Sequence, residues 1–370
     1  MKEIGILTYH TGFNYGASLQ AYALQTTIKK MGHDCEIINF ETERFVASRE
    51  MFSRKPKRIK EWIKILTRIP YHSALIKRQR LFEEYTNNCL DISPLYRTEQ
   101  EVINHANDYK CICCGSDQIW NLDREMDAPA ANPIFFLNFP KQQRRISYAA
   151  SFGKFVNKAY QQEDEFMPWL KQFDAISVRE ESGVNYLKEN GIDCELVLDP
   201  TVLLDKEDYD LICTERLIEK PYVLLFSWSC GKDVVNAAKI VARELNLPLV
   251  TLTPPPRTML SGIKRKLDVG PREFLSMIKF ADFVVTDSFH GTAFSTTYEK
   301  PYVSIVSGGK ADTRMESLLK QLGLSEHLVD VSHMNIEKMK NTDFVSVREK
   351  KYKLRKNSYS FLKNALECLK

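Results

Sequence analysis

The sequence is poor in the features that mark several classes of protein. Only 15 Gly and 15 Pro occur among 370 residues, and hydrophobic residues make up 44%, so collagen-like, low-complexity and disordered chains are excluded. No apolar run approaches the roughly 18 residues that a membrane span needs. The short apolar run near the N-terminus soon turns polar, unlike the core of a signal peptide. We therefore expect a cytoplasmic globular protein.

Signatures of metal and cofactor binding are also missing. The chain has no H-E-x-x-H pair, no pair of C-x-x-C motifs, no P-loop and no G-x-G-x-x-G fingerprint, so neither a zinc site nor a dinucleotide is favoured. Its nine Cys are an odd number spread along a long chain, which is not the pattern of a disulfide framework. We predict reduced, mostly buried thiols, no metal and no redox cofactor.

Positive charge is concentrated in one segment. The formal net charge is only +4, but residues 54–80 contain ten Lys or Arg and one acid. Apolar residues recur there with the period of a helix and form a single stripe: Ile59, Trp62, Ile63, Leu66 and Ile69. Most helices of this kind pack the stripe on the protein core. The alternative is a surface for an anionic membrane or an anionic glycan, whereas nucleic acid is disfavoured because no recognition motif accompanies the segment.

The alternation of short apolar runs with helical stretches indicates two α/β domains. The runs are typical of buried parallel strands, and a second series begins after a charged stretch at 205–220. We expect two Rossmann-like, doubly wound domains facing a cleft, over residues 1–205 and 206–344. Residues 345–370 should form a helix that returns to the first domain. Ligands of such sheets bind beyond the carboxyl ends of the strands.

The loop after the third strand of the second domain is a candidate anion site. Residues 286–292 (TDSFHGT) end a strand and open a helix, so backbone N–H groups and the positive end of a helix dipole would meet a phosphate or carboxylate there. Ser288, Gly291 and Thr292 would line this anion site. His290 could take or give a proton near neutral pH; its alternative role is a helix cap or a buried structural histidine.

The loop after the following strand brings more positive charge. Gly308 and Gly309 would let the backbone approach a ligand, and Lys310 and Arg314 would carry positive charge to the same edge of the sheet. A solvated turn with a helix beginning at Asp312 would explain the glycines equally well.

One arginine of the first domain also follows a predicted strand. Arg179 could hold a planar carboxylate through two parallel hydrogen bonds, which a lysine cannot do. The alternative is an ion pair with Glu180, Glu181 or Asp199.

Two further junctions of the first domain carry polar and small residues. Asn14 and Gly16 lie in the loop after the first strand and suit a sugar against the backbone, although a tight turn would have the same composition. Asp117 and Gln118 precede Trp120, and these are residue types that hydrogen-bond and stack on sugars. The alternative there is a buried turn with a tryptophan in the core.

Five stretches together resemble the polysaccharide pyruvyl transferase family, and they run in order over most of the chain. They are residues 14–22 (NYGASLQAY), 115–120 (GSDQIW), 177–180 (SVRE), 198–201 (LDPT) and 286–292 (TDSFHGT). The resemblance implies a GT-B-like pair of Rossmann-type domains, with the acceptor on the first and the donor on the second. It implies transfer of a pyruvyl group from phosphoenolpyruvate, the only co-substrate, to two hydroxyls of one sugar.

The product implied by the resemblance is a cyclic ketal on a precursor of a cell-surface or capsular polysaccharide, with phosphate released. Carried over residue by residue, Arg179 resembles the family's arginine at the donor, His290 its catalytic histidine, and Lys310 a basic residue after the following strand. A lipid-linked acceptor would bring the protein to the inner face of the membrane. Two rival functions remain: a glycosyltransferase that uses a nucleotide sugar, and a non-catalytic glycan-binding protein on the same fold.

Overall fold

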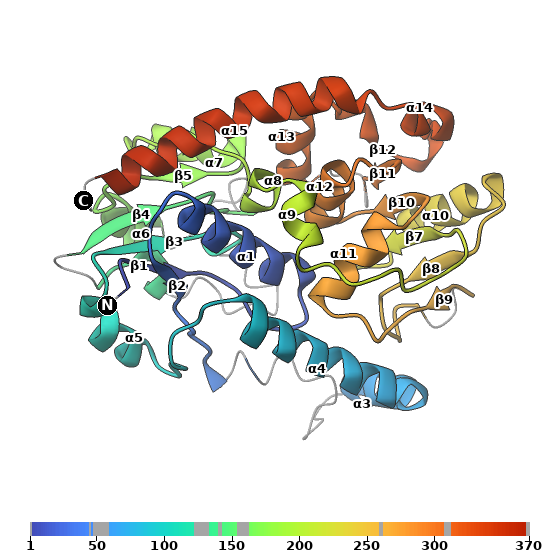
Figure 1. Cartoon of the computed structure of the whole chain (residues 1–370), viewed down its shortest axis with the longest axis horizontal. Coiled ribbons are helices and arrows are strands. Elements are labelled where there is room, and N and C mark those ends of the chain that lie inside the picture. The colour runs from blue at the N-terminus through green and yellow to red at the C-terminus, as the bar shows by residue number, and fades with distance from the viewer. Residues whose placement is uncertain are drawn as a thin grey trace. The chain divides into compact units, whose positions relative to one another are not determined.

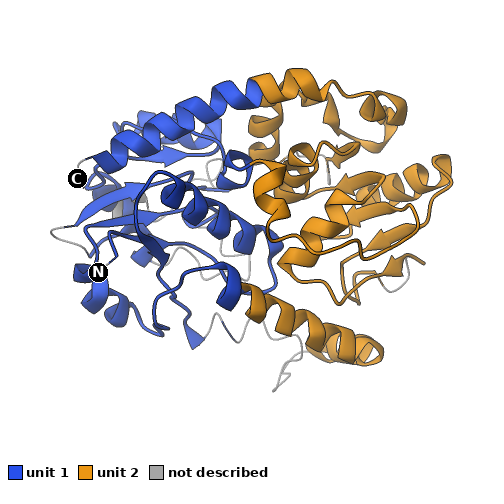
Figure 2. Cartoon of the chain, viewed as in Figure 1, with its two compact units in different colours: residues 1–49, 86–204, 350–370 blue, residues 50–85, 205–349 orange. Residues whose placement is uncertain are grey.

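The computed structural model describes residues 2–43, 46, 59–121, 133–139, 143–153, 163–258, 262–306 and 312–367. The chain divides into two compact units, coloured separately in Figure 2. Unit 1 comprises residues 1–49, 86–204 and 350–370, and unit 2 comprises residues 50–85 and 205–349. Each unit contains a parallel sheet flanked by helices (Figure 1), so the α/β class predicted from the sequence is confirmed.

Unit 1 is built on six parallel strands. The order is β2-β1-β3-β4, and isolated bridges from Ile146 to Ala175 and from Ala150 to Val178 continue it to the pair β5-β6. In such an order the connections reverse direction between β1 and β3, which makes this the ligand-binding switch point. The strands are β1 (Ile4–Leu7), β2 (Cys35–Ile37), β3 (Cys111–Cys114), β4 (Arg144–Ser147), β5 (Ser177–Val178) and β6 (Glu195–Leu196).

The central strands β1 and β3 of unit 1 are buried on both faces, as is typical of a parallel sheet covered by helices. Every residue of β1 and β3 is buried, and Ile4 pairs with Cys111. Burial raises the pKa of the Cys111 thiol to about 12, so this sulfur stays protonated at neutral pH. Five of the described cysteines are buried thiols, as the composition predicts.

The N-terminal ends of two helices in unit 1 are capped by side chains. Asn14 Oδ1 accepts hydrogen bonds from the backbone N–H groups of Gly16 and Ala17 at the start of α1, and Thr98 with Glu101 forms a capping box at α5. The helical segments are α1 (Tyr15–Lys30), α5 (Glu99–His105), η2 (Ala106–Asp108), η3 (Pro133–Phe136), α6 (Glu163–Leu170), α7 (Glu181–Glu189), α8 (Pro200–Leu203) and the later part of α15 (Phe344–Leu366).

Unit 2 has the strand order β12-β11-β10-β7-β8-β9, all parallel. In the chain order of its own strands this is the Rossmann arrangement, with its switch point between β7 and β10. The strands are β7 (Val223–Phe226), β8 (Leu249–Thr251), β9 (Lys264–Arg265), β10 (Phe283–Thr286), β11 (Tyr302–Ile305) and β12 (Leu328–Val329).

Unit 2 carries most of the helices, and two helices, α4 and α15, continue from one unit into the other. Asp312 caps α13 and Gly323 ends it in the left-handed conformation, φ 70°. The helical segments are α3 (Ile59–Arg68), η1 (Ile69–Tyr71), α4 (His72–Cys89), α9 (Lys206–Asp210), α10 (Lys232–Glu244), α11 (Pro271–Lys279), α12 (Phe289–Thr297), α13 (Thr313–Leu322), η5 (Ser325–His327), η6 (Val331–His333), α14 (Ile336–Lys340) and the start of α15.

The basic segment corrects two predictions. From the sequence, residues 54–80 are expected in the first domain, whereas residues 50–85 belong to unit 2. The physical reason is long-range hydrogen bonding, because Arg78 Nη1 donates to the carbonyl of Leu252 at 2.9 Å. The apolar stripe was expected on the core, but Ile59 is 80% exposed and Trp62 53%.

Candidate functional site

The switch point of unit 2 carries a carboxylate held by two serines. Asp287 follows β10, while Ser227 and Ser229 follow the neighbouring strand β7. Asp287 Oδ2 accepts hydrogen bonds from Ser227 Oγ at 2.9 Å and from Ser229 Oγ at 2.7 Å. The two serines are not among the residues predicted from the sequence, although their position directly after a buried apolar strand is a signal that could have identified them.

Thr286, the last residue of β10, fixes the path of the chain into α12. Its hydroxyl donates to the carbonyl of Phe226 at 2.7 Å and accepts from the backbone N–H of Ser288 at 3.0 Å. Ser288 is the residue before the first turn of α12, and its backbone is extended. This arrangement aims the first N–H groups of a nine-residue helix at the carboxyl edge of the sheet, where an anion would be stabilised.

His290 lies in that first turn, as the sequence predicts. Its ring packs edge-on against Phe289, with 5.1 Å between ring centroids, and the residue is 7% exposed. The imidazole is therefore mostly buried beside a helix N-terminus rather than in solvent. A histidine so placed can transfer a proton to a ligand bound at the helix end.

Gly291 is required by close packing at the same turn. A Cβ atom there would collide with Thr286 Oγ1 and would lie 2.9 Å from Cδ1 of Phe226. Thr292, the next residue, is buried, and its hydroxyl is 2.7 Å from that of Ser304 on β11. Gly291 and Thr292 thus shape the start of α12 by packing against β7, β10 and β11.

Arg314 is paired within its own helix turn. Its Nε donates to Asp312 Oδ1 at 2.8 Å, a second hydrogen bond joins Nη2 to Oδ2, and the guanidinium lies 5.9 Å from the ring centroid of Phe289. The carboxylate neutralises much of the positive charge that was predicted at this edge. The helix start at Asp312 is confirmed. Gly308, Gly309 and Lys310 lie outside the described residues.

The switch point of unit 1 holds a buried polar network. Gln20 of α1 donates through Nε2 to Thr8 Oγ1, and its Oε1 accepts from the backbone N–H of Ser116. Thr8 follows β1 and in turn donates to the carbonyl of Ser116, which follows β3. These bonds tie the first loop to the Gly115–Asp117 turn and hold Ser116 beside Asp199, whose Oδ2 accepts from Ser116 Oγ at 3.0 Å.

Arg179 is surrounded by carboxylates. Its Nη1 lies 2.5 Å from Asp199 Oδ2, Nη2 lies 3.3 Å from Asp117 Oδ1, and Nε lies 3.9 Å from Glu180 Oε2. The side chain is 1% exposed. Asp199 is held in turn by the backbone N–H and hydroxyl of Thr201. The ion pair with Asp199, named above as an alternative, is thus present in the structure.

The remaining predicted residues of unit 1 have local structural contacts. The Asn14 carbonyl oxygen caps α1, and Gly16 is buried in the first turn of that helix. Gln118 Oε1 accepts from Asn121 Nδ2 at 2.6 Å. Trp120 is fully buried and donates its indole N–H to the carbonyl of Phe135 at 3.0 Å, so it belongs to the core and does not stack on a sugar.

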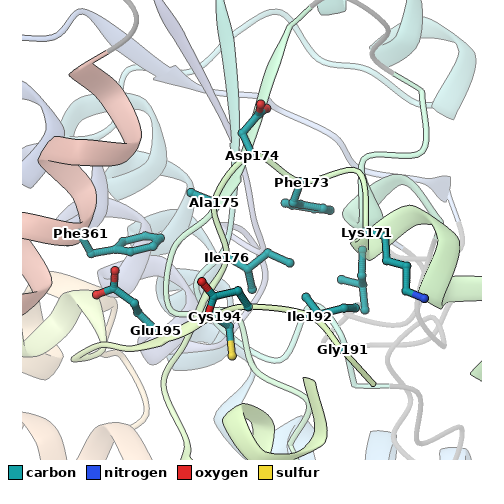
Figure 3. Close-up of a pocket in the computed structure, with 12 residues that line it drawn as sticks. Lys171, Phe173, Asp174, Ala175, Ile176, Gly191, Ile192, Cys194, Glu195 and Phe361 are labelled. Carbon is teal, nitrogen blue, oxygen red and sulfur yellow. The ribbon is translucent and has the colours of Figure 1, made fainter. Parts of the chain in front are cut away.

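A pocket of about 340 Å³ lies at the other edge of the unit 1 sheet. Its lining residues 173–176 precede β5 and its lining residues 191–194 precede β6, which places it at the amino ends of these strands. Figure 3 shows Phe361 and Glu195 at one side of the pocket and Lys171 at the other. Ligands of such sheets bind at the carboxyl ends, so this pocket is not the candidate site.

No cluster of three or more His, Cys, Asp or Glu side chains suited to a metal ion occurs among the described residues. Among the described residues, the two switch points offer a ligand carboxylates, hydroxyls, helix N–H groups, the guanidinium of Arg179 and the imidazole of His290.

A family model described as polysaccharide pyruvyl transferase matches residues 14–308. The matched region contains Arg179 and His290 and ends before Lys310 and Arg314. No curated protein sequence matches the chain significantly.

Solved structures show the fold. A protein of Listeria monocytogenes assigned as a UDP-N-acetylglucosamine 2-epimerase has a TM-score of 0.50 at 13% identity, over 96% of this chain and 91% of that one. A second UDP-N-acetylglucosamine 2-epimerase has a TM-score of 0.50 at 12% identity, over 99% of this chain and 95% of that one. The GT-B-like class of two Rossmann-like units is therefore confirmed, while identities this low carry no conclusion about activity.

Proposed function

This chain belongs to the polysaccharide pyruvyl transferase family, and we propose that it transfers a pyruvyl group from phosphoenolpyruvate to two hydroxyls of one sugar. Membership makes it a transferase that acts on a saccharide acceptor. The donor, the cyclic ketal and the polysaccharide precursor at a cell surface or capsule are the proposed part. The observation that carries the proposal is the position of His290, in the matched region and in the first turn of α12 at a Rossmann switch point.

The reaction needs one proton donor and one proton acceptor. A proton adds to C3 of phosphoenolpyruvate, C2 of the enol phosphate becomes electrophilic, and the first sugar hydroxyl adds to C2. The C2–O bond to phosphate then breaks, and the second hydroxyl closes the ketal. Of the two hydroxyl protons, one balances the proton gained at C3 and the other leaves with phosphate. The reaction involves no net oxidation or reduction, so it needs no redox cofactor, and we also propose that it proceeds without a metal.

His290 is the proposed acid and then base. Protonated, it would supply the proton to C3, and neutral, it would accept a proton from the attacking hydroxyl. The start of α12 favours an anion through its N–H groups and the helix dipole, which suits the phosphate or carboxylate of the donor. Ser288, Gly291 and Thr292 are assigned to this anion site, and Gly291 keeps the backbone accessible where a side chain would collide with Thr286.

Arg179 is proposed to contact the carboxylate of the donor. Its ion pair with Asp199 is buried, whereas the 3.3 Å contact to Asp117 is longer, and the Asp117 side chain is 9% exposed against 0% for Asp199. Asp117 is therefore the carboxylate that an incoming donor carboxylate would replace, while Asp199 keeps the guanidinium in place. Lys310 and Arg314 remain proposed contacts to the donor. The proposed contacts to the acceptor are Asn14, Gly16 and Gln118.

The test is saccharide-dependent release of phosphate. The full chain is incubated with phosphoenolpyruvate and extracted lipid-linked glycans in D₂O, and phosphate release is measured together with deuterium in the ketal methyl group. We expect one phosphate per ketal and one deuterium per methyl. His333→Asn is the matched control for His290→Asn, because His333 is an exposed histidine of the same unit. Phosphate release without saccharide, or none with any extract, would contradict the proposal.

A glycosyltransferase is the alternative that the fold permits, since the start of α12 could hold the pyrophosphate of a nucleotide sugar. Thermal shift separates the two donors, because a ligand that binds the native state raises the melting temperature. Stabilisation by phosphoenolpyruvate and not by nucleotide sugars supports the pyruvyl transferase. Binding of glycan without stabilisation by either donor would indicate a non-catalytic glycan-binding protein.

A further inference from the structure

The helices α3 and α4 lie along the lower edge of unit 2 in Figure 2, and they expose one apolar stripe. The stripe follows the helical period across α3 and η1, and each member is at least 46% exposed: Ile59, Trp62, Ile63, Leu66 and Ile69. Five large apolar side chains on one face exceed what scattered surface residues produce. This face is called the α3 stripe below.

The opposite face of the same helices is attached to unit 2. Arg68 Nε donates to the carbonyl of Pro255 at 3.0 Å, and Arg78 Nη1 donates to that of Leu252 at 2.9 Å. Tyr71 accepts from Arg265 Nη1 at 3.0 Å through its hydroxyl. Gly270 allows contact with Leu81, because a Cβ atom at Gly270 would lie 2.6 Å from the Cβ of Leu81. The stripe therefore points outward because the inward face is already bonded.

The charge of the segment identifies what the stripe would bind. Residues 54–80 contain ten basic residues and one acid. Lys60 of α3 and Arg80 of α4 are exposed, whereas Lys77 is paired with Asp268 of unit 2. A second copy of the chain would bring the same positive charge to the contact and be repelled. An anionic lipid surface offers both negative headgroups for the lysines and an apolar layer for the stripe.

We propose that the α3 stripe docks the protein on an anionic membrane surface. Trp62 would sit at the headgroup boundary, where the amphipathic indole ring is favoured, and Leu66 and Ile69 would enter the acyl layer. In the described part of the chain no helix is long and apolar enough to cross a membrane, so the contact is a peripheral one that lies in the plane of the interface. The proposal does not depend on the donor or on the reaction.

The experiment is co-sedimentation of the full chain with vesicles. Phosphatidylglycerol mixed with phosphatidylcholine is compared with phosphatidylcholine alone, at 0.05 M and 0.5 M salt. We expect binding to the anionic vesicles only and weaker binding at the higher salt, because salt screens exposed charge. Replacing Lys57, Arg58 and Lys60 by Gln should lower the partition coefficient about 100-fold, since each basic residue near the surface contributes roughly fivefold.

Two matched controls separate the membrane contact from general effects. Trp62→Ser with Leu66→Ser should abolish binding, whereas Leu211→Ser, at a residue of unit 2 that is 80% exposed, should leave it unchanged. Lys232, Lys239 and Lys338, all exposed in unit 2, are replaced by Gln as the charge control and should also leave binding unchanged. Circular dichroism of each variant verifies the fold.

Absence of binding to anionic vesicles at low salt would overturn the proposal. Equal loss of binding in the control variants would overturn it as well, because the effect would not be specific to the stripe. Self-association in light scattering that disappears with Trp62→Ser and Leu66→Ser, without vesicle binding, would instead assign the stripe to a second copy of the chain.

Discussion

Arg179 Nη1 and Asp199 Oδ2 lie 2.5 Å apart in the interior of unit 1, and neither side chain is more than 1% exposed. A buried pair of this kind constrains both partners, because removing either leaves the other charge unpaired in a medium of low polarity. The pair therefore links the stability of unit 1 to the geometry of the proposed donor contact.

Arg179→Lys should weaken donor binding by about 1.5–3 kcal/mol, the usual range for a hydrogen bond to a charged group. Lysine keeps the charge but cannot bond both Asp199 and the donor carboxylate from one planar fork. The measurement is the Michaelis constant for phosphoenolpyruvate, with the melting temperature recorded in parallel. If the Michaelis constant and turnover both stay at the wild-type values, Arg179 does not contact the donor.

Asp199→Asn should destabilise the protein by about 3–5 kcal/mol, because it breaks a buried ion pair and weakens the acceptor of Ser116. Urea unfolding measures the change in free energy of unfolding. Asp193→Asn is the control, since Asp193 is exposed in the same unit and should change the stability by less than about 0.5 kcal/mol. Equal changes in the free energy of unfolding for the two substitutions would show that the buried ion pair does not stabilise the protein more than an exposed carboxylate does.

His290→Asn should keep the fold and donor binding while turnover falls by ~10²-fold or more, the scale of losing a general acid or base. His333→Asn should keep full turnover. Single-turnover phosphate release measures the effect, and thermal shift with phosphoenolpyruvate measures donor binding. A His290→Asn variant that unfolds would indicate that the buried ring has a structural role.

Gly291→Ala should destabilise unit 2 by about 1–3 kcal/mol, the usual cost of overpacking. The added methyl group would collide with Thr286 and Phe226, and neither can move without disturbing β7 or β10. Gly231→Ala is the matched substitution, because a Cβ atom there meets only Ser229 Oγ at 3.5 Å. Comparable melting temperatures for the two variants would contradict this account of the turn.

The protein should become less stable as the pH falls, because His327 is buried. Burial lowers the pKa of this imidazole below its ordinary 6.5, so the unfolded chain takes up a proton at a higher pH than the folded chain does. The contribution of neutral His327 to the free energy of unfolding is complete above about pH 6.5. It is lost as the pH falls below that value, by at most about 1.4 kcal/mol per pH unit. Melting temperatures between pH 7.5 and 5.5 should fall more steeply for the wild type than for His327→Gln; parallel slopes would rule out this origin.

The sequence predicts the central strands well and the edge strands poorly. Residues 223–226 and 283–286 are apolar runs buried on both faces, a pattern that few other structures produce. Lys264–Arg265 and Leu328–Val329 form two-residue strands at the sheet edges. A run of two residues is too short to predict a strand, and the first of the two is also charged. Their pairing depends on neighbours distant in the sequence.

Helical periodicity likewise predicts the stripe through Trp62 and Leu66 but not its direction. The direction depends on Arg68 and Arg78, whose acceptors are carbonyl groups about 180 residues later in the chain. The partners of an ion pair are equally hard to predict from the sequence. The residue type suggests that Arg179 binds a carboxylate, but only the fold brings Asp117 beside it.

Unit 1 contains the first residues of the chain and also residues 350–367, which pack on it. Arg355 Nε donates to the carbonyl of Val202 at 2.8 Å, and Tyr359 donates to that of Leu203. During synthesis the ribosome makes residues 205–349 before it makes Arg355 and Tyr359. The unit that begins first is therefore completed last, and unit 2 can close its sheet while unit 1 still lacks its final helix. A chain cut short near residue 345 would leave unit 1, whose strands precede those of unit 2, without its final helix.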